Sequence, residues 1–242
     1  VLYLAGLLLK NKRGHLQEDI KEALIQIGST AQLLLIKELK SQDSDTDFRE
    51  AGAEILGNIG DSQALDILAE LLEDKDSSVR KAAARALGQI RDSQAIIHLI
   101  KKLKDEDNDV RLDVAWALEQ LAWIPQTKEE RMLYLIAKQD WDGLVEIGAP
   151  AIPSLIGIAK DECVFIRRFV ARTLGRIGDK QATPCLVRLL KDKEHCVAQA
   201  AAEVLERFNY KSVLEALKEL LGITPLTVEI DNLPHAGGTI IQ

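Results

Sequence analysis

The stretch VRKAAARALGQIRDSQAIIHLIKKLKD, residues 79–105, decides the fold of this chain. Its first half places apolar residues at the i, i+3, i+4, i+7, i+8 spacing of one buried helix face. The turn Arg91-Asp92-Ser93 supplies capping side chains for a second helix. One such helix hairpin cannot cover its own apolar faces, so the pattern predicts neighbours of the same kind. The expected core residues are Ala82, Ala83, Ala86, Leu87 and Ile90 in the first helix and Ala95, Ile96, Leu99, Ile100 and Leu103 in the second.

Near-copies of this stretch recur on both sides of it, as expected for a repeat protein. The pair Val79-Arg80 follows Phe48-Arg49 by 31 residues and precedes Val110-Arg111 by 31, and Ile166-Arg167 precedes Val197-Ala198 by 31. Val110 and Ile166 are 56 residues apart, which predicts one period plus an irregular insertion of 25 residues. A glycine eight residues after the arginine marks where two helices are expected to press together. These glycines are Gly57, Gly88 and Gly175.

Units such as residues 79–105 and 166–192 resemble short HEAT-like repeats, the kind found in phycobilin lyase subunits and in many bacterial and archaeal scaffold proteins. The resemblance covers roughly residues 16–221. It implies an all-α, right-handed α-solenoid of about six helix hairpins with one irregular insertion. It implies binding of other macromolecules rather than any chemistry.

The chain is expected to consist of a solenoid over residues 1–221, with the insertion at about 122–147, followed by an extended tail or cap over 222–242. Residues 1–10 read as the second helix of a hairpin whose first helix is absent. A trimmed chain or a natural half-repeat cap would explain this, and the open end could allow self-association.

Charge and composition narrow the function. A net charge of −7 and a pI near 5.3 argue against electrostatic binding of nucleic acid by the protein as a whole. They also argue against a role like that of a DNA glycosylase. The opening nine apolar residues are far too short for a membrane span. Three cysteines without a Cys-x-x-Cys pair predict reduced thiols and a cytoplasmic location.

No catalytic or metal-binding pattern stands out, and no cofactor is expected. The four histidines have no partner at metal-ligand spacing, and the His-Glu pairs of HEAT-type iron hydroxylases are absent. His195-Cys196 with Cys185 or Cys163 could form a thiol site, but the sequence shows no third group that would orient the histidine. Ordinary residues at a repeat junction explain these positions better.

The repeated arginines are expected to be structural. Arg49, Arg80, Arg111 and Arg167 share one position, and acidic residues precede them in the loops between repeats. A ladder of Arg–Asp contacts between adjacent hairpins is therefore predicted. The acids considered were Asp47, Asp76, Asp109 and Asp161.

An outward stripe on the first helices supplies the candidate partner-binding residues. Arg168, Arg172 and Arg176 lie on successive turns of one helix and form a basic ridge. This ridge is interpreted as a binding surface; the alternative is an ordinary helix face in contact with solvent. In an earlier unit the same stripe holds Leu112 and Trp116, next to Asp113. The inserted helix could cover this pair, or Trp116 could be an exposed anchor. Further candidates are Arg85 on the same stripe and the second-helix residues Asp66, Glu70, Lys101 and Lys102.

These observations predict a non-catalytic scaffold that binds another protein, one with an acidic patch, and neither nucleic acid nor membrane. The alternative is a subunit like the phycobilin lyases, which would hold a tetrapyrrole and a client protein. Alternating charge on the second helices suits selective protein recognition.

Overall fold

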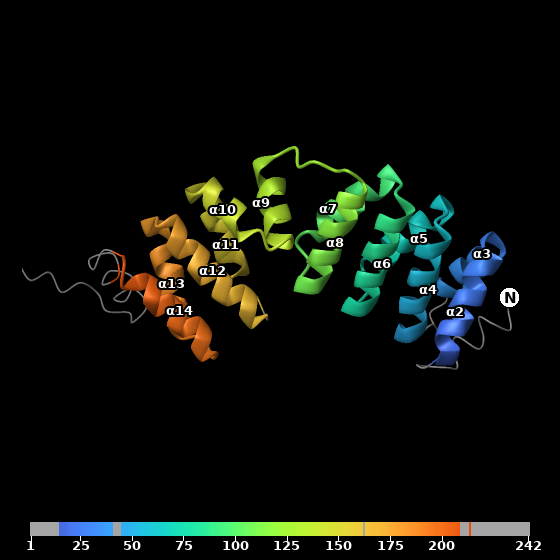
Figure 1. The fold of residues 1–242 in the computed structure, drawn as a ribbon, viewed down its shortest axis with the longest axis horizontal. Coiled ribbons are helices and arrows are strands. Elements are labelled where there is room, and N and C mark those ends of the chain that lie inside the picture. The colour runs from blue at the N-terminus through green and yellow to red at the C-terminus, as the bar shows by residue number, and fades with distance from the viewer. Residues whose placement is uncertain (1–14, 41–44, 162, 209–212, 214–242) are drawn as a thin grey trace, which may run out of the picture.

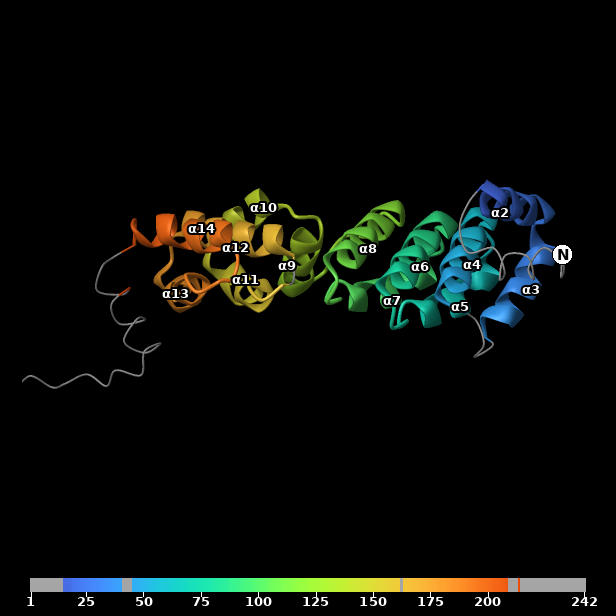
Figure 2. The same cartoon turned by 90° about the horizontal axis from the view of Figure 1, so that it is seen from below.

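The computed structural model describes residues 15–40, 45–161, 163–208 and 213. Within these ranges the chain forms helices and no strand, which confirms the predicted all-α solenoid. The helices alternate between two layers, which Figure 2 shows along opposite edges of the molecule, and the stack follows the gentle arch seen in Figure 1. The first helices of the pairs are α2 (His15–Ile27), α4 (Thr46–Ile59), α6 (Ser77–Ile90), α8 (Asn108–Gln120), α10 (Trp141–Ile147), α12 (Val164–Ile177) and α14 (His195–Leu205). The second helices are α3 (Ser29–Leu39), α5 (Leu65–Leu71), α7 (Ile96–Lys102), α9 (Lys128–Ala137), α11 (Ile152–Ile158) and α13 (Thr183–Leu189).

Aspartate side chains begin most of the repeated helices. Asp45 accepts a hydrogen bond from the Phe48 amide at 2.9 Å, and Asp76 accepts one from the Ser78 amide at 3.0 Å. Such caps satisfy backbone donors that have no partner within the helix. The helix ends are equally regular, because Gly60 adopts the left-handed conformation (φ 77°) that closes α4. These local signals set the length of each helix.

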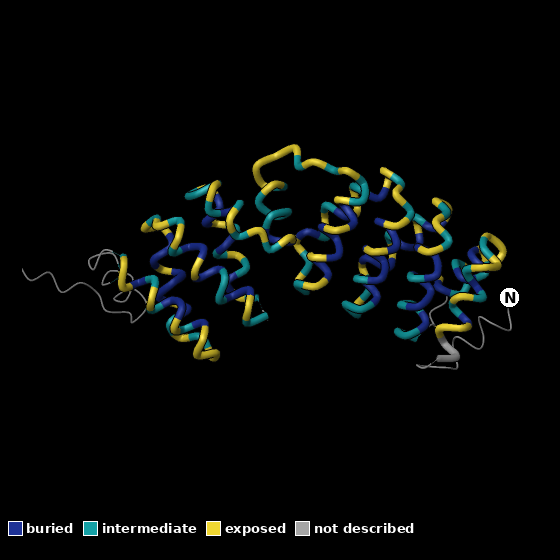
Figure 3. The backbone as a smooth tube through the Cα atoms, viewed as in Figure 1, coloured by how far each residue is buried: buried dark blue, intermediate teal, exposed yellow. Residues whose placement is uncertain are grey.

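Small residues bring the first helices close together. A Cβ atom added to Gly88 in α6 would lie 2.8 Å from the Cα of Ala117 in α8, so only glycine fits at this contact. Gly57 meets Ala86 of the next helix in the same way, and Gly175 meets Val204. The close approach predicted at these glycines is confirmed. Figure 3 shows the resulting buried strip along the inner faces of the helices.

The helices enclose two hydrophobic cores that meet at α9. One core extends from Ile20 to Ala137 and the other from Ile136 to Leu205. The segment expected to be an insertion, about 122–147, holds an extended loop followed by α9 and α10. Trp141 opens α10 one full period of 31 residues after Val110, so α9 stands where the second helix of the α8 pair belongs. The irregularity is then the short α10.

Several expectations fall outside the described residues. They are the half-hairpin at residues 1–10, self-association through it, and the tail or cap at 222–242. None of the helices that the structure describes is both long and apolar enough to cross a membrane.

Candidate binding surfaces

The repeated arginines form the predicted ladder, with partners other than those expected. Arg80 donates to Asp105 through Nε at 2.9 Å and Nη2 at 2.8 Å, and Arg167 donates to Asp192 at 2.7 and 2.9 Å. Each partner lies 25 residues after its arginine, just beyond the second helix of the same pair. Of the preceding acids expected as partners, Asp76 caps α6, whereas Asp161 does belong to the ladder, as the partner of Arg111.

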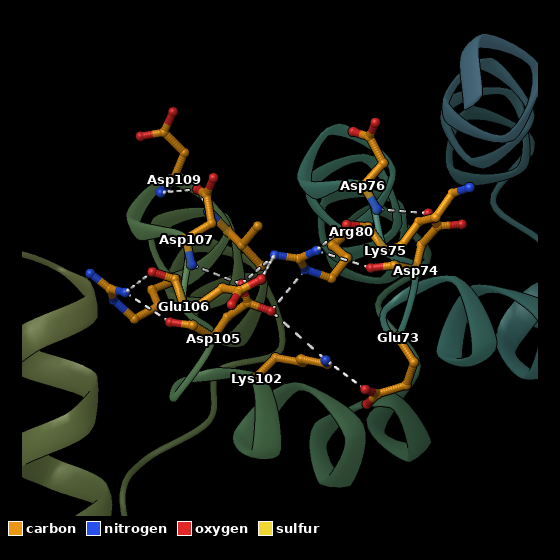
Figure 4. A network of polar contacts seen from close by, with 12 residues as sticks. Glu73, Asp74, Lys75, Asp76, Arg80, Lys102, Asp105, Glu106, Asp107 and Asp109 are labelled. Atoms are coloured by element: carbon orange, nitrogen blue, oxygen red, sulfur yellow. Dashed lines mark hydrogen bonds and ion pairs between the residues drawn. The ribbon is translucent and has the colours of Figure 1, made fainter. Parts of the chain in front are cut away.

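Each of these arginines also reaches back to the preceding pair. Arg80 Nη1 donates to the Asp74 carbonyl oxygen at 2.9 Å, and Arg111 Nη1 donates to the Asp105 carbonyl oxygen at 2.8 Å. Figure 4 shows Arg80 between these two loops. The hydrogen bond from Arg167 lowers the pKa of Asp192. Because Arg80, Arg111 and Arg167 are buried and their guanidinium groups bind acids and loop carbonyl oxygens, the ladder stabilises the stack and is not a ligand site.

At the short α10 the ladder departs from its 25-residue spacing. Arg111 Nη2 binds Asp161 at 2.5 Å, 50 residues away, and both side chains are 4% exposed. Glu119 stands in α8 at the position that glycine holds in α4 and α6. It accepts a hydrogen bond from the hydroxyl of Tyr134 in α9 at 3.2 Å and pairs with Lys138, the residue that follows α9. A glutamate at the glycine position is the sequence signal that the regular stack stops here.

The basic ridge lies on α12, and its three arginines differ in their surroundings. Arg176 Nη1 binds Asp142 of α10 at 2.6 Å. Arg172 is exposed, and Arg168 is half-buried with its Nε buried and unpartnered. Neither Arg168 nor Arg172 has an ion pair with a residue that the structure describes. Glu203 of α14 accepts a hydrogen bond from Gln199 of the same helix at 3.0 Å.

Phe165 was not among the residues expected to bind a partner, yet it belongs to the same helix face. It lies three residues before Arg168 and seven before Arg172, and it is 63% exposed. The other units carry Asp47, Ser78, Asp109 or Cys196 at this position, so an aromatic residue here was the available signal. We call Phe165, Arg168, Arg172 and Arg176 the α12 surface.

The inserted helix does not cover Leu112 and Trp116, so that interpretation was wrong. Leu112 is 42% exposed and Trp116 is 38% exposed, and the Trp116 ring lies against Gly88 of α6. Arg85, a further candidate, donates from Nε to Asp113 at 2.9 Å. Asp113 is buried, its Oδ2 has no partner, and burial raises its pKa.

The second-helix candidates divide into free and engaged residues. Asp66, Glu70 and Lys101 are exposed and have no ion pair within the described part of the chain. Lys102 binds Glu73, two residues beyond the end of α5, at 2.7 Å and lies 3.8 Å from Asp105. Part of the predicted alternating charge is therefore used to join α5 to α7.

A groove lies where the two cores meet, and we call it the junction groove. It consists of two adjoining cavities of about 710 and 590 Å³ that share Lys104, Asp105, Arg111, Gly157 and Ile158. A Cβ atom added to Gly157 would meet nothing within 4 Å, so this glycine borders open space. The sequence did not predict the groove because its walls come from α9 and α11, which lie on either side of the short α10 in the chain. The apolar wall is formed by Met132, Leu133, Ile136, Pro150 and Pro153.

Among the described residues, no group of histidine, cysteine and acidic side chains is placed to hold a metal ion. Cys163 is half-buried, Cys185 is buried and Cys196 is exposed, and all three are free thiols. Burial raises the pKa of the Cys185 thiol, although Arg188 beside it acts in the opposite direction. A raised pKa is the opposite of what a nucleophilic cysteine requires.

Comparison with known proteins identifies the repeat type. A family model described as HEAT repeats matches residues 32–119 and 142–228. The phycocyanobilin lyase subunit alpha of Nostoc sp. is 33% identical over 93 residues, which are 35% of this chain and 34% of that protein. The same subunit of Picosynechococcus sp. is 29% identical over 126 residues, 48% of this chain and 46% of that protein. The chain thus spans between a third and a half of the length of these curated relatives.

Solved structures with a similar fold include the complex of CpcE and CpcF of phycocyanin lyase from Nostoc sp. (18% identity, TM-score 0.40, 93% of this chain and 95% of that chain). Human deoxyhypusine hydroxylase is also similar (19% identity, TM-score 0.41, 90% and 88%). At these TM-scores the likeness carries no argument about function.

Proposed function

This chain belongs to the HEAT-repeat family, and we propose that it is a scaffold that binds the acidic patch of another protein through the α12 surface. The observation that carries the proposal is the local excess of cations around α12, two of which, Arg168 and Arg172, have no ion pair with a described residue. Residues 160–193 hold nine Lys and Arg against four Asp and Glu, within a chain of net charge −7. The chain is therefore basic only locally.

Several cations elsewhere in the described part of the chain are paired with acids. Lys21 binds Glu54 at 2.6 Å and Lys104 binds Glu129 at 2.8 Å, in addition to the ladder pairs. Arg168 and Arg172 lack such partners among the described residues, although α12 packs against both α10 and α14. Free arginines on a rigid helix can donate to carboxylates on a partner without first breaking a pair.

Phe165 adds an apolar anchor to this basic surface. Arginine and aromatic residues are enriched at the centres of protein interfaces, where they supply most of the binding energy. A partner that offers carboxylates beside a small apolar depression would match both features of the α12 surface.

The test compares a charge-reversed variant with a matched control. Arg168→Glu combined with Arg172→Glu should abolish capture of the partner from cells of the source organism, with bound proteins identified by mass spectrometry. Lys37→Glu makes the same kind of change on exposed α3 and should leave capture intact. Rising salt should weaken the unmodified complex, since charge pairs at the interface are screened. Undiminished capture by the double variant would contradict the proposal.

A second candidate, a subunit that holds a tetrapyrrole, is supported by the junction groove and by the names of the curated relatives. The groove sets an apolar wall beside Lys104, a combination suited to an apolar molecule with a carboxylate. Mixing the chain with a bilin should shift the bilin's visible absorbance. Gly157→Phe should suppress the shift by filling the open space beside the glycine. An unchanged spectrum would exclude this candidate.

A further inference from the structure

A further pocket, which shares Lys160 and Asp161 with the junction groove, lies between α11 and α13, and we call it the basic pocket. Its volume is about 400 Å³, in the range of small-molecule sites. Five cationic residues line it: Arg167, which is paired with Asp192 in the ladder, and four others, Lys160, Arg188, Lys191 and Lys193. Its apolar lining comes from Ile156, Ala159, Cys185 and Leu189.

The acids of this pocket are already engaged. Asp161 is bound by Arg111 at 2.5 Å and Asp192 by Arg167 at 2.7 Å, as parts of the ladder. None of the four cations has an ion pair with a residue that the structure describes. The pocket therefore gathers four positive charges with no free carboxylate among its lining residues.

The equivalent interface between α5 and α7 is built differently. Glu73 directly precedes the ladder residue Asp74, as Lys160 directly precedes Asp161. Glu73 reaches across to Lys102 of the next second helix at 2.7 Å and neutralises it. Lys160 instead adds a positive charge opposite Arg188. Like charges gathered in this way oppose folding unless an anion occupies the space between them.

Arg188 is exposed and lines the pocket beside the buried Cys185. Its guanidinium is close enough to the buried Cys185 thiol to act on the pKa of that group. A fork of N–H donors at this position can bind two oxygens of one ligand. The apolar side chains beside it can accept a short hydrocarbon portion.

We propose that the basic pocket binds a small organic oxyanion with two negative charges, a phosphate monoester or a dicarboxylate. The oxygens lie between Arg188 and Lys160, and the apolar portion lies against Ile156 and Leu189. The site is distinct from the α12 surface, because its residues come from the second helices and the loops that follow them.

The test is calorimetric titration of the whole chain with phenyl phosphate and, separately, with succinate at low salt. At least one should bind with a Kd below about 1 mM. Lys160→Glu should weaken binding at least about tenfold, because it removes one contact and adds a repelling charge. Lys101→Glu makes the same change on exposed α7, outside the pocket, and should alter the Kd less than about twofold. Binding of one probe alone identifies which oxyanion class the pocket takes.

A stability measurement separates this inference from general loss of structure. Without ligand, Lys160→Glu should raise the melting temperature by about 1–3 °C, because it replaces one of the gathered positive charges with a negative one. Partner capture through the α12 surface should be unaffected. Binding of neither probe, or binding that Lys160→Glu leaves unchanged, would overturn the inference.

Discussion

At the residue scale, the buried aspartates divide into two kinds with opposite effects on stability. Asp192 accepts hydrogen bonds from Arg167, which lower its pKa, so its ionised form stabilises the fold. That contribution is present above the ordinary aspartate pKa and is lost as the pH falls through the lowered value. Asp113 has a pKa raised by burial, which the hydrogen bond from Arg85 does not offset. Its ionised form therefore costs stability at neutral pH.

Asp113→Ala should stabilise the chain by about 0.5–1.5 kcal/mol at pH 7, since it removes a buried carboxylate with one unpartnered oxygen. Alanine already holds this position in α4, α6 and α14, as Ala51, Ala82 and Ala200. The gain should shrink as the pH falls, because protonated Asp113 carries no charge penalty. Urea denaturation at pH 7 and pH 4.5 would measure both effects. A loss of stability at pH 7 would show that the Arg85 pair outweighs the burial.

At the element scale, glycines in first and second helices have different roles. Gly88 lies where α6 touches the backbone of α8, whereas Gly157 in α11 faces open space. Gly88→Ala should destabilise by about 1–3 kcal/mol through overpacking. Gly157→Ala should stabilise by about 0.5–1 kcal/mol through helix propensity. Thermal unfolding of the two variants would measure this contrast, and equal shifts would contradict it.

Helix periodicity and the glycine spacing were sufficient to predict the hairpins and their close contacts, because both are local or strictly repeated. The sequence predicted a ladder of Arg–Asp contacts, but it did not identify the aspartates that pair with Arg49, Arg80 and Arg167. Asp105 approaches Arg80 only because the second helix brings the chain back to that point. No local sequence pattern around Asp105 indicates this contact. The junction groove could not be predicted at all, since it depends on how α9 packs against α11, two helices separated in the chain by the short α10.

At the scale of the whole molecule, two cores are joined across α9, and the Arg111–Asp161 pair bridges them while buried. Arg111→Ala should cost about 3–5 kcal/mol, because it leaves Asp161 buried without its partner. Lys104→Ala removes an exposed pair at the same junction and should cost less than about 1 kcal/mol. Hydrogen exchange of the arginine variant should show the two cores opening at different rates. A single shared opening rate would mean that the pair does not couple them.

Hydrogen–deuterium exchange of the captured complex would test the central proposal most directly, because it locates the partner without altering the surface. Binding at the α12 surface predicts slower exchange across residues 164–177 when the partner is present, with residues 77–90 of α6 unchanged. Slower exchange confined to the second helices, or an α12 unaffected by the partner, would contradict the account.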